Sequence, residues 1–326
     1  AVPSARRVPR SGMSADRPVL GIALMLAFCL LAPLTDGLAK MVGGAVAVVH
    51  LVALRFAFQA AIVLPLLFAT GGRLAMPRRA LALVALRTAL QIAGVAAMFL
   101  ALRHLPLADA IAIAYVMPFL VLLFGWWVLD ERVGWRRVAA CITGFAGTLM
   151  VMQPSLAEVG WPALLPLAVA ALFAAFVLIT RHISAQVTPL QMQGAGGLIG
   201  CLMLLPALPF AQPAAWAPLM GETRDVMLVA LLAGVGVIGT LSHLALTAAL
   251  KHAPAALLAP MQYLEIPAAV ALGLLLFGEF PDGLALAGIA VVTGAGLYVI
   301  HRERAQARAA RRGSRPAPDA ARSAAG

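Results

Sequence analysis

Charged residues are scarce in this sequence, and the usual composition of a soluble protein is missing with them. Only 11% of the 326 residues are charged and 63% are hydrophobic, with a mean hydropathy of +0.96. Soluble domains carry about 25% charged and 45–50% apolar residues. The composition therefore excludes a water-soluble protein.

Cysteine pairs and the common cofactor motifs are also missing. The three cysteines, Cys29, Cys141 and Cys201, lie inside apolar runs at spacings that suit neither a disulfide framework nor a metal site. No Walker A loop, dinucleotide fingerprint or HExxH motif occurs. We therefore expect no cofactor, no metal, no catalytic residue and no ATP-driven transport by this chain.

Acidic residues are fewer than basic ones, with 13 Asp and Glu against 24 Lys and Arg, for a formal net charge of +11. A nucleic-acid-binding surface requires basic residues clustered on one exposed face. Here they lie at the termini and in short gaps between apolar stretches. This pattern predicts a partner in the lipid bilayer and none in nucleic acid.

Long apolar runs are abundant, and about 20 such residues span the hydrocarbon core. The first run is long enough to be retained as a helix, and translation starting at Met13 would not change it. Loops mostly under ten residues leave no room for a soluble catalytic domain. We predict an all-α integral membrane protein with ten transmembrane helices, near 19–39, 46–69, 80–101, 106–128, 135–153, 162–180, 190–210, 226–249, 255–277 and 283–300.

The basic residues also predict an orientation. With the N-terminus in the cytoplasm, 19 of the 24 Lys and Arg residues lie on the inner side and three on the outer side. The positive-inside rule therefore predicts both termini in the cytoplasm of a multi-pass inner-membrane protein. Residues 1–18 form a basic N-terminal segment, and the arginine-rich tail, 302–326, is predicted to lie disordered against anionic lipid.

The chain contains an internal repeat. Residues 101–131 and 249–279 align at a constant offset of 148 residues, with identities that include His104/His252, Pro106/Pro254, Tyr115/Tyr263 and Glu131/Glu279. A unit of five helices inverts the second copy in the membrane, so we predict two inverted five-helix repeats, 19–153 and 162–301. Such repeats are typical of secondary transporters with a midplane site and alternating access. The alternative is a duplication retained for packing only.

The repeat resembles a known family. Similarity to the EamA domain of the drug/metabolite transporter superfamily is carried by ALRHLPLADAIAIAYVMPFLVLLFGWWVLDERVGWRRVAACITGFAGTLMVMQP and by YLEIPAAVALGLLLFGEFPDGLALAGIAVVTGAGLYVI. Arg55-Phe56 is similar to an Arg-Phe pair common in that family, whereas the second copy has Gly196 opposite Arg55. The resemblance covers residues 19 to 301 and implies a ten-helix metabolite carrier. Members handle amino acids, nucleotide-like metabolites, vitamins such as riboflavin, and drugs, so the solute does not follow from it.

Ionisable residues inside the predicted helices are candidates for function because each costs at least ~2.5–3.5 kcal/mol to insert. From a rise of ~1.5 Å per residue, Arg55 and Glu265 lie near the midplane and Arg87 nearer the cytoplasmic end of its helix. Two acids lie close to the outer surface. Arg87, Asp109 and Glu265 each have an uncharged repeat equivalent, which favours a role in solute binding. The five are Asp36, Arg55, Arg87, Asp109 and Glu265.

The two arginines are predicted to make the cavity electropositive, for a carboxylate, a phosphate or an electron-rich ring. Glu265 would then counter a solute cation or carry a coupling proton. The alternative is a permanent pair between Arg55 or Arg87 and Glu265 or Asp109 that fixes helix packing. By contrast, Glu131 and Glu279 occur in both repeats at helix ends, so we interpret them as structural.

Polar and aromatic residues complete the predicted cavity: Gln59, Gln91, Tyr115, Gln262 and Tyr263. The repeat-equivalent tyrosines would either sandwich a planar solute or pack the interface between the repeats, with a hydroxyl bonded across it. His243 is predicted to bond a neighbouring helix. Pro118 and Pro267, at nearly equivalent positions, are predicted to interrupt their helices near the site or to leave a static kink.

Two other classes of function compete with a transporter. A non-transporting membrane scaffold requires an exposed partner surface, which the short loops do not offer. A membrane-embedded enzyme requires clustered acids, bases or metal ligands, whereas the polar residues here are dispersed. The sequence therefore favours a secondary carrier of a small metabolite or drug-like solute.

Overall fold

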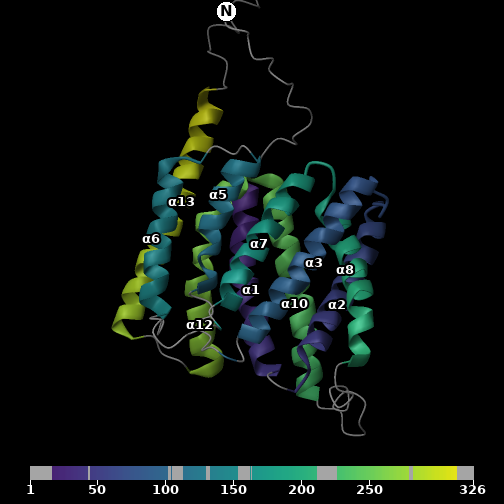
Figure 1. Cartoon of the computed structure of the whole chain (residues 1–326). Coiled ribbons are helices and arrows are strands. Elements are labelled where there is room, and N and C mark those ends of the chain that lie inside the picture. Colours follow the sequence, from purple (N-terminus) through teal and green to yellow (C-terminus); the bar gives the residue numbers. More distant parts are fainter. Residues whose placement is uncertain are drawn as a thin grey trace, which may run out of the picture.

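The computed structural model describes residues 17–42, 45–101, 104, 113–129, 133–152, 162, 164–210, 226–278 and 282–313. Within these ranges the regular secondary structure is entirely helical (Figure 1). Asp109, Glu131 and Glu279 lie outside the described residues, as do 1–16 and 314–326.

The helices run side by side in one bundle (Figure 1). The first half contains α1 (Pro18–Val42), α2 (Val48–Ala69), α3 (Arg78–Ala101), α5 (Met117–Leu129) and α6 (Trp135–Met152). The second half contains α7 (Leu164–Ile183), α8 (Pro189–Leu204), η2 (Leu205–Phe210), α10 (Val226–His252), α11 (Ala255–Leu258), η4 (Ala259–Leu264), α12 (Glu265–Phe277) and α13 (Gly283–Gly313).

Eight helical stretches in the described residues are long and apolar enough to cross a membrane, and Met117–Val128 is a shorter apolar helix. The chain is therefore a multi-pass membrane protein. Ten spans were expected. Of the two missing from the eight, 106–128 is described only in part, and the span near 135–153 is α6, whose first turn carries Arg136 and Arg137.

The last helix differs from its prediction. Helix α13 continues to Gly313, so the prediction of a disordered tail is wrong for residues 302–313. Residues 302–313, RERAQARAARRG, consist mainly of alanine and arginine, which are among the strongest helix formers. The helix therefore extends past its apolar part into the basic segment.

Helices of the first half pack against helices of the second. Helix α1 lies along α10, α3 along α7, α2 along α8, and α6 along α13. The start of α1 and the end of α13 lie at the same end of the bundle (Figure 1). We call the end at which α1 begins the N-terminal side, and the other end the opposite side.

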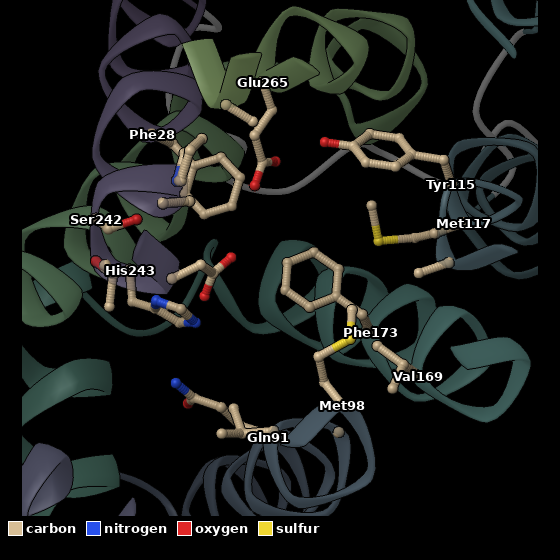
Figure 2. Close-up of a pocket in the computed structure, with 18 of the residues that line it drawn as sticks. Phe28, Gln91, Met98, Tyr115, Met117, Val169, Phe173, Ser242, His243 and Glu265 are labelled. Carbon is tan, nitrogen blue, oxygen red and sulfur yellow. The ribbon is translucent and has the colours of Figure 1, made fainter. Parts of the chain in front are cut away.

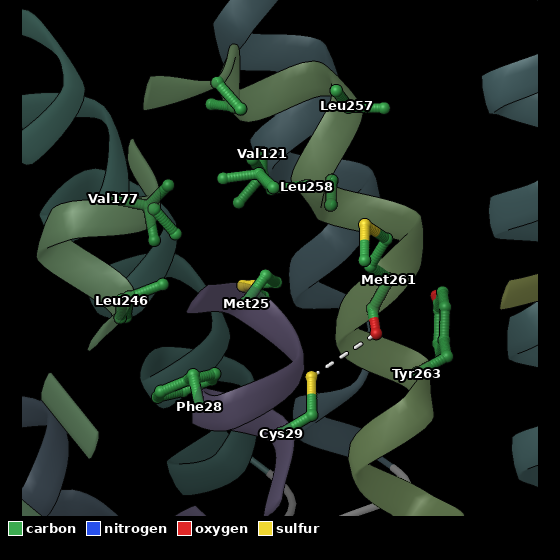
Figure 3. Packing of buried hydrophobic residues seen from close by; sticks show 14 of the residues in the cluster. Met25, Phe28, Cys29, Val121, Val177, Leu246, Leu257, Leu258, Met261 and Tyr263 are labelled. Atoms are coloured by element: carbon green, nitrogen blue, oxygen red, sulfur yellow. Dashed lines mark hydrogen bonds between the residues drawn. The ribbon is translucent and has the colours of Figure 1, made fainter. Parts of the chain in front are cut away.

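The N-terminal side is closed by a continuous apolar cluster (Figure 3). Met25 from α1 packs there with Leu246 from α10 and with Leu257 and Leu258 from α11, all at most 1% exposed. The helices approach closely at small residues: a Cβ on Gly21 would lie 2.5 Å from the Cβ of Ala253. This layer fills the middle of the described part of the N-terminal side with buried apolar side chains.

Two spans near the middle of the bundle are discontinuous. In the second half, the 3₁₀ turn η4 separates α11 from α12, and in the first half residues 115–116 form a turn before α5. Pro118 and Pro267 lie in the first turns of α5 and α12, where a proline does not remove a helical hydrogen bond. The prolines thus begin new helical segments, whereas the sequence placed them inside longer helices.

Candidate functional site

A cavity of about 280 Å³ lies between the two halves of the bundle. Its wall is formed by α1, α2, α3 and residues 114–117 from the first half, and by α7, α10 and α12 from the second. Both halves therefore contribute to one site, close to the lower end of the size range of small-molecule pockets.

The cavity occupies one side of the bundle only. On α1 the wall runs from Phe28 to Lys40, on α3 from Leu90 to Met98, and on α12 from Glu265 to Gly273. Each of these stretches lies in the half of its span that leads to the opposite side. The cavity therefore extends from the middle of the bundle toward the opposite side, away from the apolar cluster of the N-terminal side.

Most of the wall is apolar, and aromatic rings and thioethers contribute to it. Phe28, Phe173 and Tyr115 surround the space together with Met98 and Met117 (Figure 2). Phe173 and Phe176 contact each other with ring centroids 5.3 Å apart. Flat rings and adaptable methionines favour a planar, largely apolar solute.

Arg55 joins α2 to α10 through a polar contact on the wall. Its Nη2 lies 2.6 Å from Nδ1 and 3.1 Å from Nε2 of His243 on α10. Because a guanidinium only donates, the imidazole accepts this bond. Helix α10 allows the approach through Gly239, since a Cβ there would lie 2.9 Å from Arg55 Nε. The predicted bond of His243 to a neighbouring helix is present, and its partner is the charged residue of the wall.

Two carboxylates face the cavity from different helices. Asp36 lies on α1 and is exposed, and Glu265 opens α12 and is partly buried. The Glu265 carboxylate and the Tyr115 hydroxyl point toward each other (Figure 2). In the described part of the chain no ion pair joins either acid to Arg55, so the alternative of a fixed Arg55–Glu265 pair is not what this structure contains.

Several buried polar atoms on the wall have no hydrogen-bond partner among the described residues. They are both amide atoms of Gln91, the hydroxyl of Ser242 and Nε of Arg55. Buried polar groups in proteins are normally hydrogen-bonded. These atoms belong to residues that line the cavity, so hydrogen-bonding capacity on the wall is unused in this conformation.

Four of the predicted cavity residues, Gln59, Arg87, Gln262 and Tyr263, are not on the wall. Gln59 Nε2 donates to Gln193 Oε1 and to its carbonyl oxygen, both at 2.8 Å, which ties α2 to α8. Gln262 lies buried in η4. Arg87 is fully buried and bonded to threonine hydroxyls, so it forms no pair with Glu265 either.

The two repeat-equivalent tyrosines contact each other directly. Their ring centroids are 5.7 Å apart at an interplanar angle of 27°, and Tyr263 Oη donates to the Tyr115 carbonyl oxygen at 3.1 Å. Of the two alternatives left by the sequence, the geometry is that of interface packing. In this conformation the two rings contact each other, and Tyr115 also lines the cavity.

The sequence did not single out the aromatic wall. Phe28, Phe173 and Phe176 line the cavity, but a phenylalanine in an apolar helix has the same pattern whether it faces lipid, core or a cavity. Ser242 could have been found, since it is polar, lies in a predicted span and is adjacent to His243. Lys40 was assigned to the outer surface and also reaches the wall.

Comparison with known proteins gives consistent matches. The pattern of the EamA-like transporter family matches residues 19–153 and 160–301. A riboflavin transporter of Rhizobium johnstonii is 32% identical over 219 residues, 67% of this chain and 69% of that protein. An S-adenosylmethionine uptake transporter of Rickettsia bellii is 25% identical over 286 residues, 87% of this chain and 94% of that protein.

One solved crystal structure shows the same fold. It superposes with a TM-score of 0.69 at 21% sequence identity, covering 85% of this chain and 94% of that chain.

Proposed function

The chain belongs to the EamA-like transporter family, and from this premise we propose that it is a secondary transporter that moves a small organic solute across the inner membrane by alternating access. Its family and relatives make it a small-molecule transporter and not an enzyme. The observation that carries the proposal is the cavity between the two halves, with unpartnered polar atoms on an aromatic wall.

The packing supports ten transmembrane helices in two inverted repeats, 19–153 and 162–301. Under that proposal α2 corresponds to α8 and α6 to α13, and each of these helices packs on its own counterpart. The contact of α1 with α10 likewise corresponds to that of α3 with α7. A pseudo-twofold axis in the membrane plane produces this arrangement.

We propose that the N-terminal side faces the cytoplasm, with both termini there. The distribution of Lys and Arg supports this orientation through the positive-inside rule. The cavity then faces outward, and the Met25–Leu258 layer closes the cytoplasmic exit. Transport requires a second conformation in which that layer separates and the outer side closes.

The wall supports a planar solute that carries both polar and apolar surface. Relatives named for riboflavin and S-adenosylmethionine transport carry solutes with flat heteroaromatic rings. The rings and methionines of the wall suit such a face, and Arg55, Gln91 and Ser242 offer donors and acceptors at its edge. Glu265 and Asp36 would counter a solute cation or carry a coupling proton.

The test is flux through the purified protein in sealed vesicles, with a panel that includes riboflavin and S-adenosylmethionine. We expect at least one compound to enter faster than into protein-free vesicles. Gly94→Leu should reduce that flux because Gly94 lines the cavity, with only Leu172 within 4 Å of its Cβ position. Gly134→Leu is the matched control, since nothing lies within 4 Å of that position. No flux of any compound would favour a non-transporting scaffold.

A further inference from the structure

Arg87 on α3 is a buried cation without a counter-charge in the described part of the chain. Its side chain is 0% exposed. Nε donates to Thr180 Oγ1 on α7 at 2.7 Å, and Nη2 donates to Thr247 Oγ1 on α10 at 3.0 Å. Both partners are neutral hydroxyls, so the charge itself is uncompensated, which is unfavourable in a protein interior.

The two threonines do not depend on Arg87 to place their own hydrogens. Thr180 Oγ1 donates to the Phe176 carbonyl at 2.6 Å, and Thr247 Oγ1 donates to the His243 carbonyl at 2.7 Å. Thr247 also accepts from Gln193 Nε2 at 2.7 Å. Removing Arg87 therefore leaves no buried hydroxyl donor without an acceptor, and a neutral amide would serve as well to join the three helices. The hydrogen bonds therefore do not require the positive charge, whose own contact is the face of the Phe176 ring.

Part of the guanidinium is unused. Nη1 has no hydrogen-bond partner among the described residues. A guanidinium presents five N–H donors in a planar fork, and the fork matches the two oxygens of a carboxylate or the oxygens of a phosphate. The free edge of Arg87 thus has the geometry of a site for an oxyanion.

The guanidinium group lies against a ring of the cavity wall, while its unbonded Nη1 lies beside α8, 3.6 Å from where a Cβ on Gly196 would be. The guanidinium carbon lies 4.3 Å from the centroid of the Phe176 ring, and Phe176 belongs to the cavity wall. Gln91, one turn further along α3, also lines the cavity and has both amide atoms unpartnered. The polar face of α3 therefore continues from the cavity toward the N-terminal side, and Arg87 is its next group.

The shared scaffold does not require a charge at this position. The repeat-equivalent residue is Val235, which packs in an apolar cluster with Leu51 and Leu232. The fold therefore accommodates an arginine at this position in the first repeat and an apolar residue in the second.

We propose that Arg87 is a second binding position for the transported solute, specific for a carboxylate or phosphate group and covered by Phe176 in this conformation. This role of Arg87 rests on the proposed function as a transporter. As the N-terminal side opens, the Phe176 ring turns aside and the acidic group of the solute passes from the region of Arg55 and Gln91 to the free edge of Arg87.

The first test needs no solute. Because Arg87 is an uncompensated buried charge, Arg87→Met and Arg87→Gln should each raise the melting temperature of the purified, solute-free protein by about 2–4 °C. Arg87→Lys, which keeps the charge, should not. A fall in melting temperature for both neutral variants would assign Arg87 to structure and overturn the proposal.

The second test compares solutes that differ by one acidic group: S-adenosylmethionine with its decarboxylated form, and riboflavin 5′-phosphate with riboflavin. In vesicles of known orientation, Arg87→Gln should raise the half-saturation concentration of the acidic member about tenfold on the N-terminal side. The member without the acidic group should change less than about twofold, and Arg87→Lys, which keeps the charge but not the planar fork, should recover only part of the loss.

The outcomes separate the two proposals. Equal effects on both members of each pair, or wild-type values for Arg87→Gln, would overturn the role of Arg87 while leaving transport intact. No flux of any panel compound through the wild-type protein would overturn the proposed function, and the Arg87 proposal with it.

Discussion

Two buried arginines of this protein lie in contrasting surroundings. Arg55 lies on the cavity wall, where its Nη2 donates to His243 and its Nε has no partner. Arg87 lies behind that wall, where it bonds to two threonine hydroxyls and stacks on Phe176. The residue type is the same, so the neighbouring helices decide which guanidinium a solute reaches in this conformation. Breaking either set of contacts tests that difference.

The largest effect is expected from Arg55→Met. This variant removes the only guanidinium on the described wall together with its bonds to a solute, each worth about 1.5–3 kcal/mol. Flux in vesicles should fall about 100-fold. Arg73→Met is the matched control, because Arg73 is exposed outside the cavity. Full flux with normal membrane insertion would reject a role of Arg55 in solute binding.

Phe176→Ala should make the surroundings of the two arginines more alike. Without the ring, Arg87 faces the cavity, and the half-saturation concentration of riboflavin 5′-phosphate on the opposite side should fall about threefold. Phe173→Ala is the control, because Phe173 lines the cavity without covering Arg87. Equal responses of the two variants would contradict the covering role of Phe176. The melting temperature should fall, since loss of a buried phenylalanine costs about 3–5 kcal/mol.

His243→Ala should have a smaller effect, because it removes the acceptor that holds the Arg55 guanidinium and leaves the charge in place. We expect flux to fall about fivefold, equivalent to about 1 kcal/mol, because the guanidinium is less well held but still present on the wall. His243→Gln retains an acceptor and should stay within about twofold of wild type. A similar loss in both variants would mean that the imidazole ring itself contacts the solute. The measurement is flux as a function of riboflavin concentration for each variant.

The smallest change is expected from Tyr263→Phe. It removes the bond of Tyr263 Oη to the Tyr115 carbonyl and keeps the stacked rings. Stability should fall by about 1 kcal/mol, measured by thermal unfolding, with flux almost unchanged. A large loss of flux would place this hydroxyl at the solute and contradict its role in the interface.

The helices were predictable from sequence because apolar runs of membrane-spanning length leave the chain few alternatives. The predicted span near 226–249 corresponds to α10, and the span near 283–300 to the apolar part of α13. The extension of α13 to Gly313 was missed because hydropathy reports insertion in lipid, whereas helix propensity decides what an alanine- and arginine-rich segment does outside it.

The site was predictable only where burial makes polarity costly. That argument singled out Arg55, Gln91, Tyr115 and Glu265, all of which line the cavity. It could not separate them from Arg87, because the rotation of α3 that places Gln91 on the wall and Arg87 behind Phe176 is set by packing between the two halves. The rotations of α1 and α7, which place their phenylalanines on the wall, likewise cannot be predicted from sequence patterns.

The 3₁₀ turn η4 divides one membrane span into α11 and α12, and its Met261 carbonyl accepts a bond from the Cys29 thiol of α1 at 3.5 Å. A 3₁₀ turn has a different hydrogen-bonding pattern from the α-helices on either side, and the thiol adds only a weak bond between it and α1. The segments on either side can therefore pivot at a few backbone dihedrals, with the cost of rearrangement confined to a single turn. The span thus consists of two short helices, α11 and α12, joined by a turn that directly precedes Glu265 of the cavity wall.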